Sequence, residues 1–427
     1  MGTDPPRLGA PWALGSPDIG AWLRLLAAGT LAGVVAGLVG AIVILIITGL
    51  QHLAFGYEVG SFFEGIEQSD PVRRVVALGV SGCLGAAAWW LLRTRGRPVV
   101  SVAEALQGRR MPAVETLGDA SAQFVTVGLG ASLGRELAPR LVAAMIGQRL
   151  AGALRLGHSD ATIVVGCAAG AGLAAVYDIP LAGAVFALEV ALAAFSLRAA
   201  VIAMLSSAIA AWIAGVVVPA PPLEPTSGLS GSAALSVWAL LAGPVLGLGG
   251  ALFVRAVRTL ERRRPPGAWL LLVMPLAYLA VGALSVAEPA VLGDGKPMLQ
   301  ATITGLLPLG ALALLLLAKA AATLGTIGAG AAGGTLTPAL AMGSGVGALL
   351  GAAWSLLWPG VPPAAFALVG ACAFLASSMR APLTATVIAL ELFALGPGML
   401  LPLMLAVAGA ALMGRWAERM PRLRGVT

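Results

Sequence analysis

The sequence lacks charge to an extent that excludes several classes of protein. Only 11% of its 427 residues are Asp, Glu, Lys or Arg, against about 25% in an average soluble domain. Hydrophobic residues make up 59% of the chain, and the mean hydropathy is +0.94. Disorder requires the opposite balance of low hydrophobicity and high charge. The composition therefore excludes a soluble globular domain and a disordered chain, and it indicates a membrane protein.

Cysteine and histidine are also scarce. Cys83, Cys167 and Cys372 lie in apolar stretches at spacings that match no zinc motif, and an odd count argues against a disulfide framework. His52 and His158 each stand alone near the end of an apolar run. We therefore expect no metal site and no cofactor.

Long apolar runs dominate the chain, and Gly and Pro interrupt several of them. The first run, 21–53, exceeds the length of about 20 helical residues that spans a bilayer, and so predicts a tilted helix. Non-helical backbone at membrane depth is tolerated only where protein or a watery cavity surrounds it. We therefore predict an all-α polytopic membrane protein with many tilted and broken helices, and a pore or site at the breaks.

An internal repeat relates two halves of the chain. Two pairs of segments match in the same order: 170–190 with 372–392, and 134–141 with 333–340. The paired prolines and glutamates are not explained by apolar composition. The loop after the first span of the first half is acidic, and its counterpart at 258–264 is basic, which places them on opposite sides of the membrane. The halves are therefore predicted to be inverted, with the substrate site between them near the bilayer midplane.

The arginine clusters orient the chain, because Lys and Arg favour cytoplasmic loops. The net charge of +7 is explained in the same way, since a membrane protein usually carries its excess Lys and Arg in cytoplasmic loops. We therefore expect no nucleic-acid partner. Both termini are predicted to be cytoplasmic, in a cell membrane of the bacterial inner-membrane type. The predicted segments are an N-terminal tail 1–19 that is no signal peptide, a first half 20–218, a linker 219–232, an inverted second half 233–418 and a C-terminal tail 419–427.

Two glycine-containing breaks, 130–139 and 328–338, each open a helix. Free N–H groups and the positive end of the helix dipole bind anions there, and such partial charges hold an ion weakly enough to release it. Glu136 stands at the first of these openings. Its carboxylate would fill the site as a tethered anion and vacate it on protonation, so Glu136 is a candidate gate and proton carrier. The alternative is a buried structural glutamate paired with Arg135.

Four motifs in order resemble those of the CLC family of chloride channels and proton–chloride antiporters: Gly134-Arg135-Glu136, 170–183, 333–338 and 378–384. The resemblance covers about 20–424 and is to prokaryotic-type members, without the CBS domains that some members append. It implies a homodimer with one pore in each subunit, transport of chloride or a similar small anion, and Glu136 as the outer gate. The implied anion contacts at the two helix starts are Gly134, Arg135, Leu137, Gly334, Thr335 and Leu336.

The sequence departs from the family pattern at four places. The proline after Glu136 lies one position later than usual. The first filter loop lacks its central serine, with Arg97 or Pro98 near that place, and Pro98 is the candidate anion contact there. Leu423 stands at the position of the inner-gate tyrosine, and Val190 at that of the internal proton-transfer glutamate. These departures favour channel-like or weakly proton-coupled conduction. A strict proton–anion antiporter, including a fluoride-exporting type, is the alternative.

Several other charged residues require an interpretation. Glu189 and Glu391 occupy equivalent repeat positions, which favours capping a helix or pairing with Arg380 or Arg198, although Glu189 and Glu104 are also accessory proton candidates. Asp178 and Arg380, each shortly before a Pro-Leu pair, are expected to start helices. Lys319, alone in an apolar run, is expected to be paired or to snorkel.

Two rival functions have requirements that can be compared with the sequence. A cation–proton carrier would need clustered intramembrane carboxylates, which the chain does not offer. A membrane-embedded enzyme would need a nucleophile beside a base, or metal ligands, within the spans.

Overall fold

The computed structural model describes residues 19–218 and 229–419, and the regular secondary structure within them consists of helices joined by short turns and loops. The helices before residue 219 are α1 (Ile19–Phe55), α2 (Phe62–Gln68), α3 (Pro71–Arg95), α4 (Val102–Leu106), α5 (Ala113–Gly128), α6 (Leu137–Ala153), α7 (His158–Tyr177), α8 (Pro180–Phe186), the π-helical turn η1 (Ala187–Ala191) and α9 (Leu197–Val217). The tail 1–18, the segment 219–228 and residues 420–427, which include Leu423, lie outside the described residues.

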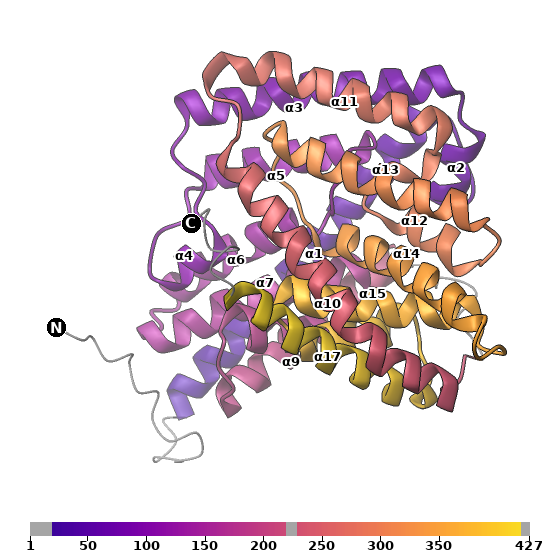
Figure 1. Cartoon of the computed structure of the whole chain (residues 1–427). Coiled ribbons are helices and arrows are strands. Elements are labelled where there is room, and N and C mark those ends of the chain that lie inside the picture. Colours follow the sequence, from indigo (N-terminus) through magenta and orange to yellow (C-terminus); the bar gives the residue numbers. More distant parts are fainter. Residues whose placement is uncertain (1–18, 219–228, 420–427) are drawn as a thin grey trace.

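The second set of helices follows the same order of long and short elements (Figure 1). It consists of α10 (Ala233–Arg262), η2 (Gly267–Trp269), α11 (Leu270–Ala287), η3 (Pro289–Val291), α12 (Lys296–Ile303), α13 (Leu309–Gly328), α14 (Leu336–Ser355), α15 (Pro363–Met379), α16 (Pro382–Leu392), η4 (Pro397–Met399) and α17 (Leu400–Arg419).

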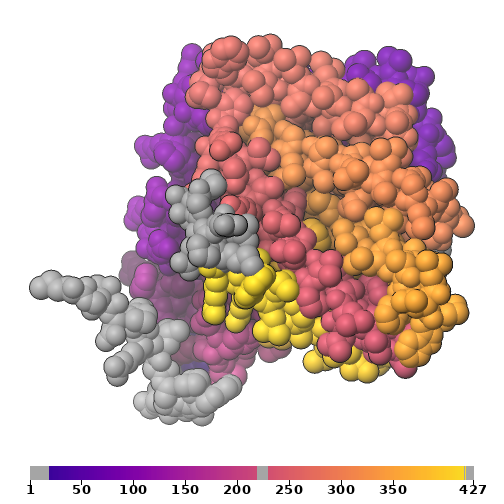
Figure 2. Space-filling model, viewed as in Figure 1, coloured from indigo at the N-terminus to yellow at the C-terminus, as the bar shows by residue number. Residues whose placement is uncertain are grey.

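The described residues include nine helices that are long and apolar enough to cross a membrane. The first, α1, has 37 residues and is therefore about 55 Å long, so it must tilt in a hydrocarbon core of about 30 Å. Large apolar side chains cover the outside, as at Leu240 and Leu241 of α10, which crosses the face shown in Figure 2. In water this surface would be unstable. The protein is therefore a multi-pass membrane protein.

Small residues let the long helices of each half approach closely. A Cβ added at Gly37 of α1 would lie 2.9 Å from the carbonyl oxygen of Ala210 on α9, and one added at Gly243 of α10 would lie 2.5 Å from that of Ala406 on α17. Such contacts replace the hydrophobic driving force that is missing between helices in lipid. Between the halves, α3 packs against α11 at the top of Figure 1, with Gly82 against Pro275.

Backbone details recur in the two halves at matching positions. After α5 and α13 the chain turns through Gly130 and Gly330, which have φ of +97° and +100°. After α7 and α15 it turns through Asp178 and Arg380, which have φ of +55° and +56°. The expectation that Asp178 and Arg380 start helices is therefore wrong. They end the preceding helices, because the prolines two positions later can begin a helix but cannot continue one.

Candidate functional site

The two glycine-containing breaks meet in the interior of the protein. Gly134 donates its N–H to the carbonyl of Gly334 at 2.7 Å, and Gly334 donates its N–H to the carbonyl of Gly134 at 2.9 Å. This reciprocal pair has local two-fold symmetry and joins the segment before α6 to the segment before α14. The repeat in the sequence, 134–141 with 333–340, pairs Gly134 with Gly333. The structure pairs Gly134 with Gly334 instead, one residue later.

A single additional residue in the first half accounts for this shift. Four residues separate Gly134 from Pro139, whereas three separate Gly334 from Pro338. The longer segment carries Glu136, which has helical dihedrals and immediately precedes α6. The extra residue therefore coincides with the candidate gate.

The Glu136 carboxylate fills the gap between the two breaks, and only 1% of the residue is exposed. Its Oε1 accepts the N–H of Leu336, the first residue of α14, at 2.8 Å. Its Oε2 accepts the hydroxyl of Tyr177, the last residue of α7, at 2.9 Å. A Cβ at Gly134 or Gly334 would collide with the carboxylate, so a larger residue at either position would have to displace the Glu136 side chain. The carboxylate thus occupies a position to which both halves contribute hydrogen-bond donors.

Arg135 turns away from this gap. Its Nε lies 3.5 Å from Oδ2 of Asp294, its Nη2 donates to the carbonyl of Val176 at 3.4 Å, and its guanidinium lies 5.2 Å from the ring centre of Tyr177. The alternative of a structural Glu136–Arg135 pair is therefore wrong. Glu136 is held by neutral N–H and O–H donors, which suit a weakly bound, exchangeable anion.

Three further anion contacts were predicted from the sequence. Leu137 begins α6 and Thr335 immediately precedes α14, so both flank the gap. Pro98 is exposed between α3 and α4, whereas Glu136 is buried. Short helix α4 packs against α6 and α7, so the divergent loop approaches the helix that Glu136 opens.

Glu189 and Glu391 cap helices reciprocally: Glu189, just after α8, caps the start of α16, and Glu391, in α16, caps the start of α8. Glu189 accepts the N–H groups of Leu383 at 3.1 Å and Thr384 at 2.6 Å, at the start of α16. Glu391 accepts those of Leu181 at 2.9 Å and Ala182 at 2.6 Å, at the start of α8. Carboxylates are favourable at helix N-termini.

Capping is therefore the role that the structure shows for both glutamates. Arg198 instead pairs with Asp160, at 3.1 Å. Val190 follows Glu189 in the turn η1 and is partly buried against the apolar core.

Glu104 lies on α4, the short helix after the divergent loop, as predicted. It forms a capping box with Ser101, whose N–H it accepts at 2.9 Å, and it pairs with Arg109. The hydrogen bond from the Ser101 backbone holds the pKa of Glu104 below its usual value. Glu104 is thus engaged as the capping carboxylate of α4.

Lys319 of α13 does not snorkel. It is fully buried, and its Nζ donates to the carbonyls of Val291 and Gly293, both at 2.9 Å. The segment that it holds also carries Asp294, the partner of Arg135. Lys319 thus fixes the loop that draws Arg135 away from the gap.

The structure adds residues to the site that the sequence did not indicate. Tyr177 and Thr337 bring two hydroxyls to Glu136, and Asp294 and Lys296 bring two charges to Arg135 and Tyr177. The one available signal was the rarity of tyrosine, which occurs three times in the chain, together with the position of Tyr177 inside the motif 170–183.

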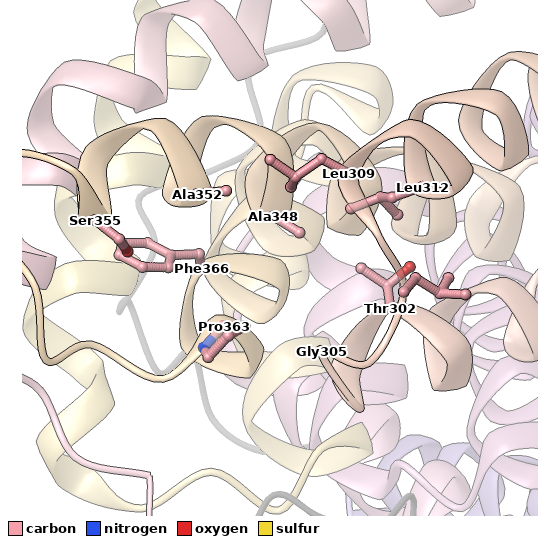
Figure 3. Close-up of a pocket in the computed structure, with 10 residues that line it drawn as sticks. Thr302, Gly305, Leu309, Leu312, Ala348, Ala352, Ser355, Pro363 and Phe366 are labelled. Carbon is pink, nitrogen blue, oxygen red and sulfur yellow. The ribbon is translucent and has the colours of Figure 1, made fainter.

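A separate cavity of about 100 Å³ lies among α12 to α15 (Figure 3). Its lining is mostly apolar: Thr302, Gly305, Leu307, Leu309, Leu312, Ala348, Ala352, Ser355, Pro363 and Phe366. It contains neither Glu136 nor any charged side chain, so it offers no chemistry for an ion. Within 19–218 and 229–419, no three His, Cys, Asp or Glu residues cluster as metal ligands would.

The fold and this site define a membrane transport protein built on two opposed sets of broken helices. A family model described as "Voltage gated chloride channel" matches residues 82–415. A "Putative chloride channel protein ClcB-like" of Ralstonia nicotianae is 34% identical over 311 residues, covering 69% of this chain and 71% of its own. A "Voltage-gated ClC-type chloride channel ClcB" of Citrobacter koseri is 28% identical over 397 residues, covering 87% and 94%.

Solved structures share the fold. A slow cyanobacterial Cl⁻/H⁺ antiporter superposes with a TM-score of 0.81 at 22% identity, over 94% of this chain and 96% of its own. A CLC-type fluoride/proton antiporter superposes with a TM-score of 0.64 at 20% identity, over 93% and 95%. The chain belongs to the voltage gated chloride channel (CLC) family, with its inverted-repeat fold, and its activity is of the CLC anion-transport type.

Proposed function

We propose that this protein conducts chloride or a similar small anion through a pore in each subunit, and that Glu136 is the gate. The observation that carries the proposal is the Glu136 carboxylate, which occupies an anion position between the two breaks and accepts hydrogen bonds from Leu336 and Tyr177. A free anion at the same place would meet the same donors. Anion and carboxylate therefore compete for one position.

Protonation is the event that opens the gate. A neutral carboxyl group is a poorer acceptor than a carboxylate, because charge-assisted hydrogen bonds are about twice as strong as neutral ones. Once protonated, Glu136 gives up its place to an anion, which leaves in turn because only partial charges hold it. The charged groups around the gate are Arg135, Asp294, Lys296 and Arg140, of which Arg135 and Asp294 form an ion pair.

We infer that conduction is channel-like or weakly coupled to protons. Val190 cannot hold a proton, Glu189 is engaged by the start of α16, and Glu104 is engaged by Ser101 and Arg109. A relay from the inner side would therefore have to rely on water. The two curated relatives are named as chloride channels, and these names agree with this proposal. Strict antiport, of chloride or of fluoride, is the alternative. The two solved structures are named as a Cl⁻/H⁺ antiporter and a fluoride/proton antiporter.

The proposal extends to assembly and location. We propose a homodimer in a bacterial inner membrane, with both termini cytoplasmic, a half 20–218 and an inverted half 233–418. The reciprocal bonds between Gly134 and Gly334 and the mutual capping by Glu189 and Glu391 support the pseudo-two-fold relation of the halves. We propose transport rather than membrane-embedded catalysis, because the site offers one carboxylate among N–H and O–H donors and no nucleophile paired with a base.

The decisive experiment is anion flux from liposomes that contain the purified protein. We expect chloride efflux that rises as the pH falls, and efflux without pH dependence in Glu136→Gln, which mimics the protonated gate. The reversal potential under a pH gradient then separates the two modes. A potential that follows the proton gradient at a fixed stoichiometry would establish strict antiport, whereas a potential set by the anion alone supports conduction.

A further inference from the structure

Beyond backbone N–H groups, the anion position contains a hydroxyl pair formed by Tyr177 and Thr337. The Tyr177 hydroxyl donates to Oε2 of Glu136 at 2.9 Å, and the Thr337 hydroxyl lies within hydrogen-bond distance of the Tyr177 hydroxyl. Because the Tyr177 hydrogen goes to the carboxylate, the Thr337 hydroxyl donates to the tyrosine oxygen in this short contact, whereas its own distance to Oε2 of Glu136 is the longer 3.5 Å. Tyr177 is 5% exposed and Thr337 is 1% exposed, so water does not compete for these bonds.

The pair joins the two halves of the protein at the gate. Tyr177 ends α7 in the first half, and Thr337 lies in the first turn of α14 in the second. Bonds in such a chain polarise each other, so the Thr337 hydroxyl strengthens Tyr177 as a donor. Two cations lie near the tyrosine ring, with the Arg135 guanidinium carbon at 5.2 Å and the Lys296 ammonium at 5.4 Å from its centre. Cations over an aromatic ring fix its orientation.

We propose that this hydroxyl pair makes the gate position selective for small, strongly hydrated anions such as chloride and fluoride over large, weakly hydrated ones such as thiocyanate. An anion that replaces the Glu136 carboxylate receives the Leu336 N–H and the Tyr177 O–H. A small anion loses the most hydration on entering a dry site, and only strong, direct donors compensate that loss. A large anion needs less compensation and gains less from the hydroxyl. Tyr177 is thus the selecting donor, and Thr337 is its positioning residue.

The test compares efflux of chloride and of thiocyanate from liposomes at one pH, and it rests on the proposed gate at Glu136. Loss of one charge-assisted hydrogen bond is expected to lower the chloride-to-thiocyanate flux ratio of Tyr177→Phe roughly tenfold. Thr337→Val should lower the ratio less, and Thr337→Ser, which keeps the hydroxyl, should restore it. Tyr278→Phe is the matched control, because it removes the same atom from a buried tyrosine that packs against α3.

If a variant transports too poorly for its flux ratio to be measured, chloride binding provides a second test of the proposal. Glu136→Gln protein is titrated with chloride in a calorimeter, with and without Tyr177→Phe, and we expect roughly tenfold weaker binding in the double variant. An unchanged flux ratio in Tyr177→Phe, or equal chloride affinity in the two proteins, overturns the selectivity proposal while the gate stands. Absence of any anion flux from the parent protein and from Glu136→Gln would overturn the gate and the selectivity together.

Discussion

Removal of either capping glutamate should destabilise the protein by a similar amount. Glu391→Ala leaves the N–H groups of Leu181 and Ala182 without acceptors, and Glu189→Ala does the same to those of Leu383 and Thr384. Glu189→Ala also removes the acceptor of the Thr384 hydroxyl, which can rotate to another acceptor, so the backbone N–H groups decide the comparison. The unpaired groups lie at the starts of α8 and α16, where the helix dipole adds to the loss. The two changes are matched to each other, since one carboxylate caps a helix in each half.

The magnitude follows from the number and burial of the lost bonds. Each partner left unsatisfied costs about 1–3 kcal/mol when buried. One of the two N–H groups in each pair belongs to an exposed residue, so we count the full cost only for its part-buried neighbour. We therefore expect a loss of about 2 kcal/mol of unfolding free energy for each change. Glu→Gln at either position keeps an acceptor oxygen and should cost less than Glu→Ala.

The assay is thermal unfolding of the detergent-solubilised protein, with anion flux measured in parallel. Glu189→Ala and Glu391→Ala should lower the melting temperature by similar amounts, and Glu189→Gln should leave any proton dependence of the flux intact. The reasoning is refuted if Glu189→Gln keeps the parent melting temperature but changes the response of flux to a proton gradient. Glu189 would then be a proton site and not a cap.

Three further predictions concern other parts of the site. Gly334→Ala should displace the Glu136 carboxylate and weaken the pH dependence of flux, measured in liposomes; retained dependence would contradict the tight fit. Lys319→Met should lower the melting temperature by the equivalent of about 3 kcal/mol, because two buried carbonyls lose their donor. The lowered pKa of Glu104 adds stability above its unfolded pKa that is lost as the pH falls through the folded value. Glu104→Gln should therefore reduce the fall of the melting temperature at acid pH. An unchanged dependence of the melting temperature on pH would contradict a stabilising role for the Glu104 carboxylate.

The sequence alone determined the class of the protein and pointed to the residue that we propose as its gate. Composition and the apolar runs indicated a polytopic helical membrane protein, because a chain so poor in charge must satisfy its backbone bonds within helices. Gly and Pro at the two breaks and the single carboxylate of Glu136 are local signals, since helix starts and dipoles depend on neighbouring residues. The repeat was also visible, because matched prolines and glutamates survive at nearly constant spacing.

Only the tertiary structure decided which groups meet at Glu136. Tyr177 and Thr337 are 160 positions apart and touch because α7 ends where α14 begins, and no local pattern encodes that meeting. The partner of Arg135 depended likewise on the loop that Lys319 holds, so proximity in sequence wrongly suggested Glu136. Side chains at the junction of two halves are chosen by packing and by the need to satisfy buried polar groups. Those constraints act between residues that are distant in sequence, so the hydrophobic periodicity of the chain does not predict which side chains meet.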